Sequence, residues 1–414
     1  MNSEIDYASE YDNSSRVENA YQLINKYISD AATYREFAAE RSQLDLAYGN
    51  GERNKMDIFW PDSAAGRERK SPMAMFIHGG YWHLMDRSCF SHLSAGLNAN
   101  GIAVAMPSYT LCPQIKVGGI INEMRRASLI LYQTFQRRIT VLGHSAGGHL
   151  AACVMATEWQ KIHSELPLDL IASGMGISGL YNLMPILKTP INNVLDMDEK
   201  QAKSASPIHW VPEAMQQFDA WVGSEESGEY HRQSRELADH WSLLGTPTYY
   251  VSVPDANHFT IVDQLVQPDS PMVKRLVKLV EQPKSDFKLP EVNEAEVDKL
   301  MHQFVEASKA PQSGDGDGGG ADDDDDDSDD GEGANSDDGD EDGGGGGGDG
   351  NLGKEQDRGE TIHSKNNGQS PAESDAEKPH RLTIPEEIEE SAEEQPKQTA
   401  KTDQADATSK KKAK

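Results

Sequence analysis

A serine in a G-x-S-x-G pattern carries the strongest chemical signal in the sequence. Ser145 lies in the segment GHSAG at positions 143–147, directly after the apolar run 139–142 and directly before a helical pattern rich in small residues. A sharp turn from a strand into a helix needs glycines where Cβ atoms would clash, and it lifts the serine hydroxyl to the carboxyl edge of a sheet. This setting predicts that Ser145 is the nucleophile of an acyl-transfer reaction.

A glycine-rich turn offers the hydrogen-bond donors that such a nucleophile needs. The segment HGGYW at positions 78–82 directly follows the apolar run 73–77. Acyl transfer develops negative charge on the carbonyl oxygen, and backbone N–H groups that face this oxygen stabilise it. We therefore expect an oxyanion loop at 78–82, with the N–H of Ala146 as a further donor.

A serine hydroxyl also needs a base, which an acid orients. In sheets of this kind the chain order is serine, acid, histidine, and the last two follow the final strands. His258 follows the predicted strand 248–253, and the segment GSEES at 223–227 follows the strand before it. We expect His258 to be the base and Glu226 the acid, with Glu225 as the fallback and Asp255, a residue typical of turns, as a further alternative.

The remaining histidines are given structural roles. His144 and His149 flank the serine and are expected to pack against the sheet, and His78 is expected to orient the oxyanion loop. Five further histidines have no carboxylate or cysteine at the spacing of metal ligands: His83, His92, His209, His231 and His240. The sequence therefore predicts neither a metal nor a cofactor.

These residues must be positioned by an α/β fold with a mostly parallel sheet of eight strands and helices on both faces. The first two predicted strands form an antiparallel hairpin at the sheet edge, because the turn signal GNG separates them. The segment 180–215 interrupts the alternation, and both a small cap over the site and an irregular surface loop fit it. The predicted strands are 44–48, 56–60, 73–77, 102–107, 139–142, 170–177, 218–222 and 248–253, and the predicted helices are 16–41, 88–100, 119–138, 146–160, 229–243 and 272–281.

Composition divides the chain of 414 residues into three parts. Residues 311–414 contain 31 Asp and Glu against 11 Lys and Arg, a net charge of −20 within the total of −30, and 18 of the 36 glycines. No aromatic residue follows Phe304, so this part is predicted to be a disordered acidic tail. We expect a catalytic domain at 1–285 and a linker at 286–310 with an amphipathic helix at 291–308.

Charge and cysteine content narrow the classes of function. The first 310 residues carry 38 acidic against 28 basic side chains, so we expect no nucleic-acid partner and instead a small-molecule substrate. Three cysteines, Cys89, Cys112 and Cys153, are expected to be reduced thiols. Without an apolar leader or a long apolar run, the protein is predicted to be cytoplasmic and to have no membrane partner. The sequence is compatible with a homodimer and leaves any partner of the tail open.

Several motifs together resemble the kynurenine formamidase (arylformamidase) branch of the α/β-hydrolases. They are HGGYW at 78–82, GHSAGGHL at 143–150, SGLYNL at 178–183, ESGEYHRQS at 226–234 and the pair His258-Phe259. The similarity covers residues 11–281 and does not extend to the tail. Animal members of the branch carry Asp where this chain has Glu226.

The resemblance implies a reaction and the residues that perform it. It implies hydrolysis of N-formyl-L-kynurenine to L-kynurenine and formate by a Ser145-Glu226-His258 triad. Oxyanion donors would be the N–H groups of Gly80, Tyr81 and Ala146. Trp82 and Phe259 would bind the aromatic part of the substrate. Two other hypotheses remain open: a carboxylesterase of small acyl esters with the same triad, and a binding protein that keeps the hydrolase fold without catalysis.

Overall fold

The structure is a computed structural model that describes residues 5–213, 216–281, 299 and 302. All of these residues belong to one of two compact units, residues 1–320. The predicted acidic tail at 311–414 and nearly all of the predicted helix at 291–308 lie outside the described residues. Within that helix only Lys299 and His302 are described, and both are helical.

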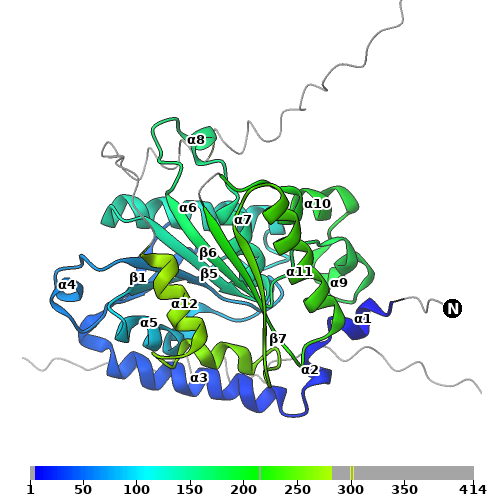
Figure 1. Cartoon of the computed structure of the whole chain (residues 1–414), viewed down its shortest axis with the longest axis horizontal. Coiled ribbons are helices and arrows are strands. Elements are labelled where there is room, and N and C mark those ends of the chain that lie inside the picture. The colour runs from blue at the N-terminus through cyan, green and yellow to red at the C-terminus, as the bar shows by residue number, and fades with distance from the viewer. Residues whose placement is uncertain (1–4, 214–215, 282–298, 300–301, 303–414) are drawn as a thin grey trace, which may run out of the picture. The chain divides into compact units, whose positions relative to one another are not determined.

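An eight-stranded sheet forms the centre of the described unit and confirms the predicted strands (Figure 1). The spatial order is β1-β2-β4-β3-β5-β6-β7-β8. Neighbouring strands from β4 to β8 are parallel, whereas β2 is antiparallel to both β1 and β4, as the hairpin prediction requires. The strands are β1 (Ser42–Ala47), β2 (Lys55–Phe59), β3 (Met73–Ile77), β4 (Ala103–Pro107), β5 (Ile139–His144), β6 (Ile171–Ile177), β7 (Gln217–Gly223) and β8 (Thr248–Val253).

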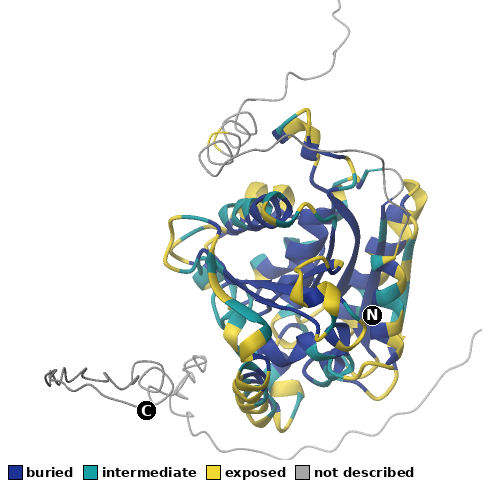
Figure 2. Cartoon of the chain, turned by 90° about the vertical axis from the view of Figure 1, so that its left-hand side faces the viewer, coloured by how far each residue is buried: buried dark blue, intermediate teal, exposed yellow. Residues whose placement is uncertain are grey.

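Helices cover both faces of the sheet, and a separate hydrophobic core lies between the sheet and the helices on each face. One core packs against α6 (Val117–Phe135), α7 (Ala146–Met155) and α11 (Gly228–Leu243). The other packs against α3 (Ala20–Phe37), α5 (Ala95–Ala99) and α12 (Pro271–Val280). The central strands are buried along their whole length, as expected for a parallel sheet between two helical layers (Figure 2). The α/β-hydrolase fold is thereby confirmed.

Three predicted helices differ in detail from the structure. The helix predicted at 16–41 is α3, which is shorter at both ends: Val17 is extended after α2 (Asn13–Arg16), and residues 39–41 form a 3-10 turn. The segment 88–100 is a 3-10 helix, η2 (Arg87–Ser94), followed by the short α5. The helix predicted at 146–160 ends at Met155, and just beyond this end the Thr157 hydroxyl donates to the carbonyl oxygen of Cys153.

The interruption at 180–215 is a chain of short helices. They are η3 (Met184–Lys188), α9 (Asn192–Leu195), α10 (Glu199–Ser204) and η4 (Pro207–His209). Leu183, Ile186 and Leu195 are fully buried in the core next to α7, so these described residues form a packed insertion. The remaining short elements are α1 (Tyr7–Glu10), η1 (Ala39–Arg41), α4 (Ala64–Arg67), α8 (Trp159–Ile162) and η5 (Thr260–Leu265).

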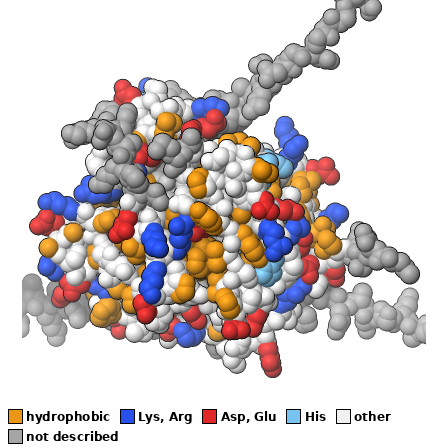
Figure 3. Space-filling view, viewed as in Figure 1, with side chains coloured by type: hydrophobic (Ala, Val, Ile, Leu, Met, Phe, Trp, Pro, Cys, Tyr) orange, Lys and Arg blue, Asp and Glu red, His pale blue; other side chains and the backbone are white. Residues whose placement is uncertain are grey.

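The surface carries charges of both signs, and the three cysteines form no disulfide. Basic and acidic side chains are interspersed over the face that Figure 3 displays. Cys89, Cys112 and Cys153 are free thiols, and the last two are buried. Among the described residues, no helix combines the length and the apolar character needed to cross a membrane.

Candidate active site

The predicted site residues meet at the carboxyl edge of the parallel strands. Ser145 directly follows β5, the loop 78–82 follows β3, Glu226 follows β7, and His258 follows β8. Because the carboxyl ends of parallel strands share one edge of a sheet, residues up to 180 positions apart in sequence are brought to one place.

Ser145 lies on a strained turn between β5 and α7. Its backbone angles are φ 56° and ψ −122°, a region that residues with a Cβ rarely adopt. A Cβ on Gly143 would lie 2.1 Å from the carbonyl oxygen of Gly147, and one on Gly147 would lie 2.0 Å from the carbonyl oxygen of Ile77. Both glycines of the motif are therefore required by close backbone approach, and they hold the serine at the start of α7.

Glu226 and His258 form a buried pair. His258 Nδ1 lies 2.7 Å from Glu226 Oε2, and the glutamate side chain is fully buried. Because the carboxylate accepts a hydrogen bond from Nδ1–H, the other ring nitrogen, Nε2, is the one available to take a proton. Glu225 and Asp255 are exposed, and among the described residues neither forms a hydrogen bond or an ion pair with His258. The geometry thus brings Glu226, rather than the alternatives, to the histidine.

Ser178 is a site residue that the sequence analysis missed. Its hydroxyl donates to Glu226 Oε1 at 2.5 Å, and the N–H of Gly223 donates to the same oxygen at 2.7 Å. Together with His258, these donors fix both carboxylate oxygens. Ser178 directly follows β6, so its place at the carboxyl edge of a strand is the signal that could have indicated it.

His144 and His149 are buried beside the site and act as neutral hydrogen-bonding groups. His144 Nε2–H donates to the carbonyl oxygen of His258 at 2.8 Å, and burial lowers the pKa of His144 well below its ordinary value. His149 accepts from the Trp82 indole N–H at 3.2 Å and donates to the carbonyl of Ala205 at 2.7 Å. Burial lowers the pKa of His149 to about 4. Both rings therefore support the turns around the site.

The predicted oxyanion loop presents backbone N–H groups without protein partners. Gly80 has φ 107° and Tyr81 has φ 47°, so the chain turns sharply there. Within the described part of the chain, the N–H groups of Gly80, Tyr81 and Ala146 donate to no other residue. Buried N–H groups usually find a partner, so this set is suited to bind a ligand oxygen.

Tyr109 supports the oxyanion loop through hydrogen bonds to its first two residues. The Tyr109 hydroxyl lies 3.1 Å from the carbonyl oxygen of His78 and 3.3 Å from that of Gly79. The rings of His78 and Tyr109 stack, with their centroids 4.3 Å apart. Burial lowers the pKa of His78 to about 4, so this histidine is neutral where it orients the loop.

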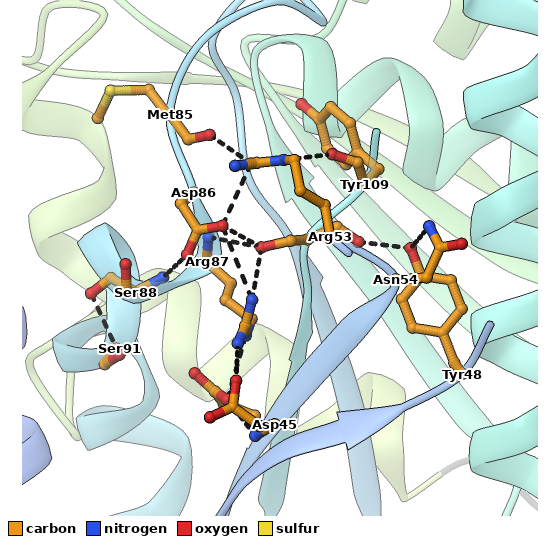
Figure 4. Close-up of polar contacts among 12 residues, drawn as sticks. Asp45, Tyr48, Arg53, Asn54, Met85, Asp86, Arg87, Ser88, Ser91 and Tyr109 are labelled. Atoms are coloured by element: carbon orange, nitrogen blue, oxygen red, sulfur yellow. Dashed lines mark hydrogen bonds and ion pairs between the residues drawn. The ribbon is translucent and has the colours of Figure 1, made fainter. Parts of the chain in front are cut away.

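A charged cluster holds the segment 85–88, which follows the oxyanion loop (Figure 4). Arg53, from the hairpin between β1 and β2, donates to the carbonyl oxygens of Tyr109 and Met85 at 2.8 and 2.7 Å. It also forms an ion pair with Asp86 at 3.2 Å. The Asp86 carboxylate accepts from the N–H of Ser88, and hydrogen bonds of this kind hold its pKa below the ordinary value despite burial.

Of the two aromatic residues predicted to bind the substrate, Trp82 is the last residue of the oxyanion loop and Phe259 directly follows His258. Trp82 is fully buried, and its indole N–H is used by His149. Phe259 is 8% exposed, and its ring meets that of His258 edge to face. Their roles in substrate binding stay predictions.

The chain is similar in sequence to known hydrolases. Residues 56–240 match the family model BD-FAE. The chain is 28% identical to the kynurenine formamidase of Danio rerio over 270 residues, which is 63% of this chain and 90% of that enzyme. It is 25% identical to the kynurenine formamidase of Drosophila melanogaster over 57% of this chain and 80% of that enzyme.

Two further similar proteins are described as esterases of other kinds. A Silicibacter sp. TM1040 protein, provisionally described as a thioesterase, has a crystal structure that matches with a TM-score of 0.58 and 30% identity. The match covers 66% of this chain and 98% of that one. An isoprenylcysteine α-carbonyl methylesterase of Arabidopsis thaliana is 27% identical over 37% of this chain and 38% of that enzyme.

Fold, site geometry and relatives together define a serine hydrolase of the α/β-hydrolase class that acts on a small molecule. Within that class, the chain is kynurenine formamidase-like in sequence, at 28% and 29% identity to two fish enzymes, and residues 56–240 match the BD-FAE family model.

Proposed function

We propose that this enzyme hydrolyses N-formyl-L-kynurenine to L-kynurenine and formate. The observation that carries the proposal is the similarity of the chain to a kynurenine formamidase over 90% of that enzyme's length. The buried Glu226–His258 pair and the oxyanion loop supply the chemistry that cleavage of a formamide requires.

The first half of the reaction forms a formyl-enzyme. Ser145 Oγ attacks the formyl carbon while His258 Nε2 takes the serine proton. Charge develops on the formyl oxygen, and the N–H groups of Gly80, Tyr81 and Ala146 bind it. The protonated His258, stabilised by the Glu226 carboxylate, then gives its proton to the departing aniline nitrogen.

The second half regenerates the serine. A water molecule takes the place of the aniline, His258 removes a proton from it, and the resulting hydroxide attacks the formyl carbon. Ser145 leaves as the alcohol, and formate departs. A formyl group needs almost no acyl pocket, so binding energy comes from the aromatic leaving group, for which Trp82 and Phe259 are the proposed contacts.

A carboxylesterase activity on small acyl esters is the second candidate. The similarity to an isoprenylcysteine α-carbonyl methylesterase favours it, because that enzyme is named for ester cleavage. The same triad and oxyanion loop would serve, and only the leaving-group contacts would differ.

Product analysis tests the proposal. Wild-type enzyme incubated with N-formyl-L-kynurenine should release L-kynurenine and formate in equal amounts, measured by chromatography. Ser145→Ala should release neither above the uncatalysed rate. Intact N-formyl-L-kynurenine alongside rapid cleavage of p-nitrophenyl acetate would favour the esterase instead.

A further inference from the structure

The N-terminal segment, residues 6–16, docks on the first turns of α11. The Glu10 carboxylate accepts from the N–H of Glu229 at 3.0 Å. The Tyr11 hydroxyl donates to the Glu229 carboxylate at 2.7 Å and accepts from Gln233 at 2.7 Å. Tyr11 is 1% exposed, so these contacts are shielded from water. The docking fixes the backbone of the segment where it passes the active site.

The side chain of Tyr81, a residue of the oxyanion loop, ends in this segment. Its hydroxyl lies 2.6 Å from the carbonyl oxygen of Tyr11 and 3.0 Å from the side-chain nitrogen of Asn13. The hydroxyl of Tyr230, on α11, lies 2.7 Å from it. The Tyr81 hydroxyl therefore joins the loop to both the segment and the helix.

Counting protons assigns a donor to each of these contacts. A carbonyl oxygen can only accept, so the one proton of the Tyr81 hydroxyl goes to Tyr11. In the contact between the two tyrosines, Tyr230 must then be the donor. With both hydroxyl protons in use, the Asn13 amide supplies its two protons, one to Tyr81 and one to Tyr230 at 2.8 Å. The Tyr81 hydroxyl thus donates once and accepts twice, which is its full hydrogen-bonding capacity.

Both tyrosines keep their protons in this network. Burial raises the pKa of Tyr81 and that of Tyr230 well above the ordinary value for a phenol. Tyr230 is fully buried and Asn13 is 7% exposed, so water competes little for these hydrogen bonds.

The backbone of Tyr81 needs such support. Its φ of 47° lies in the left-handed region, which bulky residues rarely adopt unless their surroundings fix them there. Within the described residues, its N–H donates to no other group. The N–H and the side chain branch from the same Cα atom, so anchoring the hydroxyl restricts the directions in which the N–H can point.

We propose that Asn13 and Tyr230 are positioning residues, which hold the Tyr81 hydroxyl and thereby direct the Tyr81 N–H toward the oxyanion. They act through Tyr81. The N-terminal segment, far from the triad in sequence, is in this way required for full catalytic rate. The proposal rests on the oxyanion role given to Tyr81 in the proposed function and is independent of which substrate is cleaved.

Two variants break the anchor and leave every backbone N–H in place. Tyr81→Phe removes all three hydrogen bonds of the hydroxyl. Asn13→Asp keeps the size of the side chain, but its carboxylate has no proton to give and attracts the proton of Tyr230 away from Tyr81. In that variant, Tyr81 keeps only its bond to the carbonyl of Tyr11.

Kinetics on p-nitrophenyl acetate, with phenylboronic acid as inhibitor, measures the effect. The inhibitor bonds to Ser145 Oγ as a tetrahedral adduct, and an oxygen of the adduct takes the place of the oxyanion. Each variant should lower kcat by about 10-fold to 100-fold with little change in KM, and raise the inhibition constant by a similar factor. Partial unfolding would lower kcat but leave the inhibition constant unchanged, because only folded molecules bind the inhibitor.

Tyr34→Phe is the matched control. It also removes a buried tyrosine hydroxyl, which donates to Asn98 at 2.7 Å in the hydrophobic core on the other face of the sheet. It should lower Tm but leave kcat and the inhibition constant at their wild-type values.

Two results would overturn the positioning role while Ser145→Ala remains inactive. One is a wild-type kcat in both Tyr81→Phe and Asn13→Asp, and the other is a lower kcat with an unchanged inhibition constant. Ester cleavage that survives in Ser145→Ala would instead overturn the choice of nucleophile, and the oxyanion role of Tyr81 with it.

Discussion

At the scale of single residues, the most constrained side chain of the site is Glu226. Its two oxygens accept from His258, Ser178 and the N–H of Gly223, and the side chain is fully buried. A carboxylate so enclosed can hold the imidazole in one tautomer and stabilise the imidazolium that forms during the reaction. The charge of Glu226 and the length of its side chain can therefore be tested separately.

Two substitutions of Glu226 should show separately how the charge and the length of its side chain contribute to kcat. Glu226→Gln keeps the size but loses the charge, so kcat should fall by about 10²-fold to 10⁴-fold, as for the acid of other triads. Glu226→Asp keeps the charge but withdraws it by one methylene, and a smaller loss of about 10-fold is expected. Steady-state kinetics on p-nitrophenyl acetate measures both, with Glu225→Gln as the exposed neighbouring control. An unchanged kcat in Glu226→Gln would show that another group orients His258.

The meeting place of the main candidate site residues could be predicted because each lies at the end of a strand or in the loop that follows it. Ser145, Glu226 and His258 lie where the strand pattern ends, so their meeting point follows from parallel topology alone. The hydrogen bond that Asn13 donates to the Tyr230 hydroxyl could not be predicted in this way. It joins a face of α11 to a segment 217 residues earlier, and no periodicity in the sequence indicates such a pairing.

At the scale of elements, the hairpin between β1 and β2 does more than cover the sheet edge. Arg53 at its end binds the carbonyl oxygens of Met85 and Tyr109, and Tyr109 in turn supports the oxyanion loop (Figure 4). The hairpin was predictable from its GNG turn signal. The contacts of Arg53 with Met85 and Tyr109, which we call the clamp, were not predictable, because they depend on which loop the arginine reaches. The same limit applies to η2, whose 3-10 geometry has no clear pattern in the sequence.

Removal of the clamp should affect catalysis more than binding. Arg53→Ala leaves the Asp86 carboxylate without one of its cations and frees two carbonyl oxygens, so the oxyanion loop loses its fixed position. We expect kcat to fall by about 10-fold or more with a smaller change in KM, because oxyanion stabilisation acts in the transition state. Arg67→Ala, which removes an exposed ion pair with Asp62, is the control and should leave both constants unchanged. Equal kinetics for the two variants would argue against the clamp.

At the scale of the whole described unit, several histidines are buried as neutral groups on both faces of the sheet. Burial lowers the pKa of His78, His92 and His149 to about 4 each. In the unfolded chain a histidine titrates near 6.5. Between these two values the unfolded state binds protons that the folded state cannot, so their contribution to stability is complete above about pH 6.5 and is lost as the pH falls toward 4.

The free energy of unfolding should therefore fall steeply between about pH 6.5 and pH 4. Each of the three histidines contributes a slope of up to about 1.4 kcal/mol per pH unit within this window. Urea unfolding at a series of pH values measures the slope. His92→Leu removes one titrating group, because neither ring nitrogen of His92 has a hydrogen-bond partner among the described residues. The variant should lose less stability on acidification than wild type, and an identical pH dependence would contradict the assignment.

The most direct test of the proposed function is the selectivity of the intact enzyme. We would measure kcat/KM of wild type and Ser145→Ala on N-formyl-L-kynurenine and on p-nitrophenyl acetate, with a chain truncated after Ala310 as a further comparison. The predicted result is a strong preference for the formamide that disappears in Ser145→Ala and persists in the truncated chain. Efficient ester cleavage with negligible hydrolysis of N-formyl-L-kynurenine would contradict the formamidase proposal and leave an esterase with the same serine.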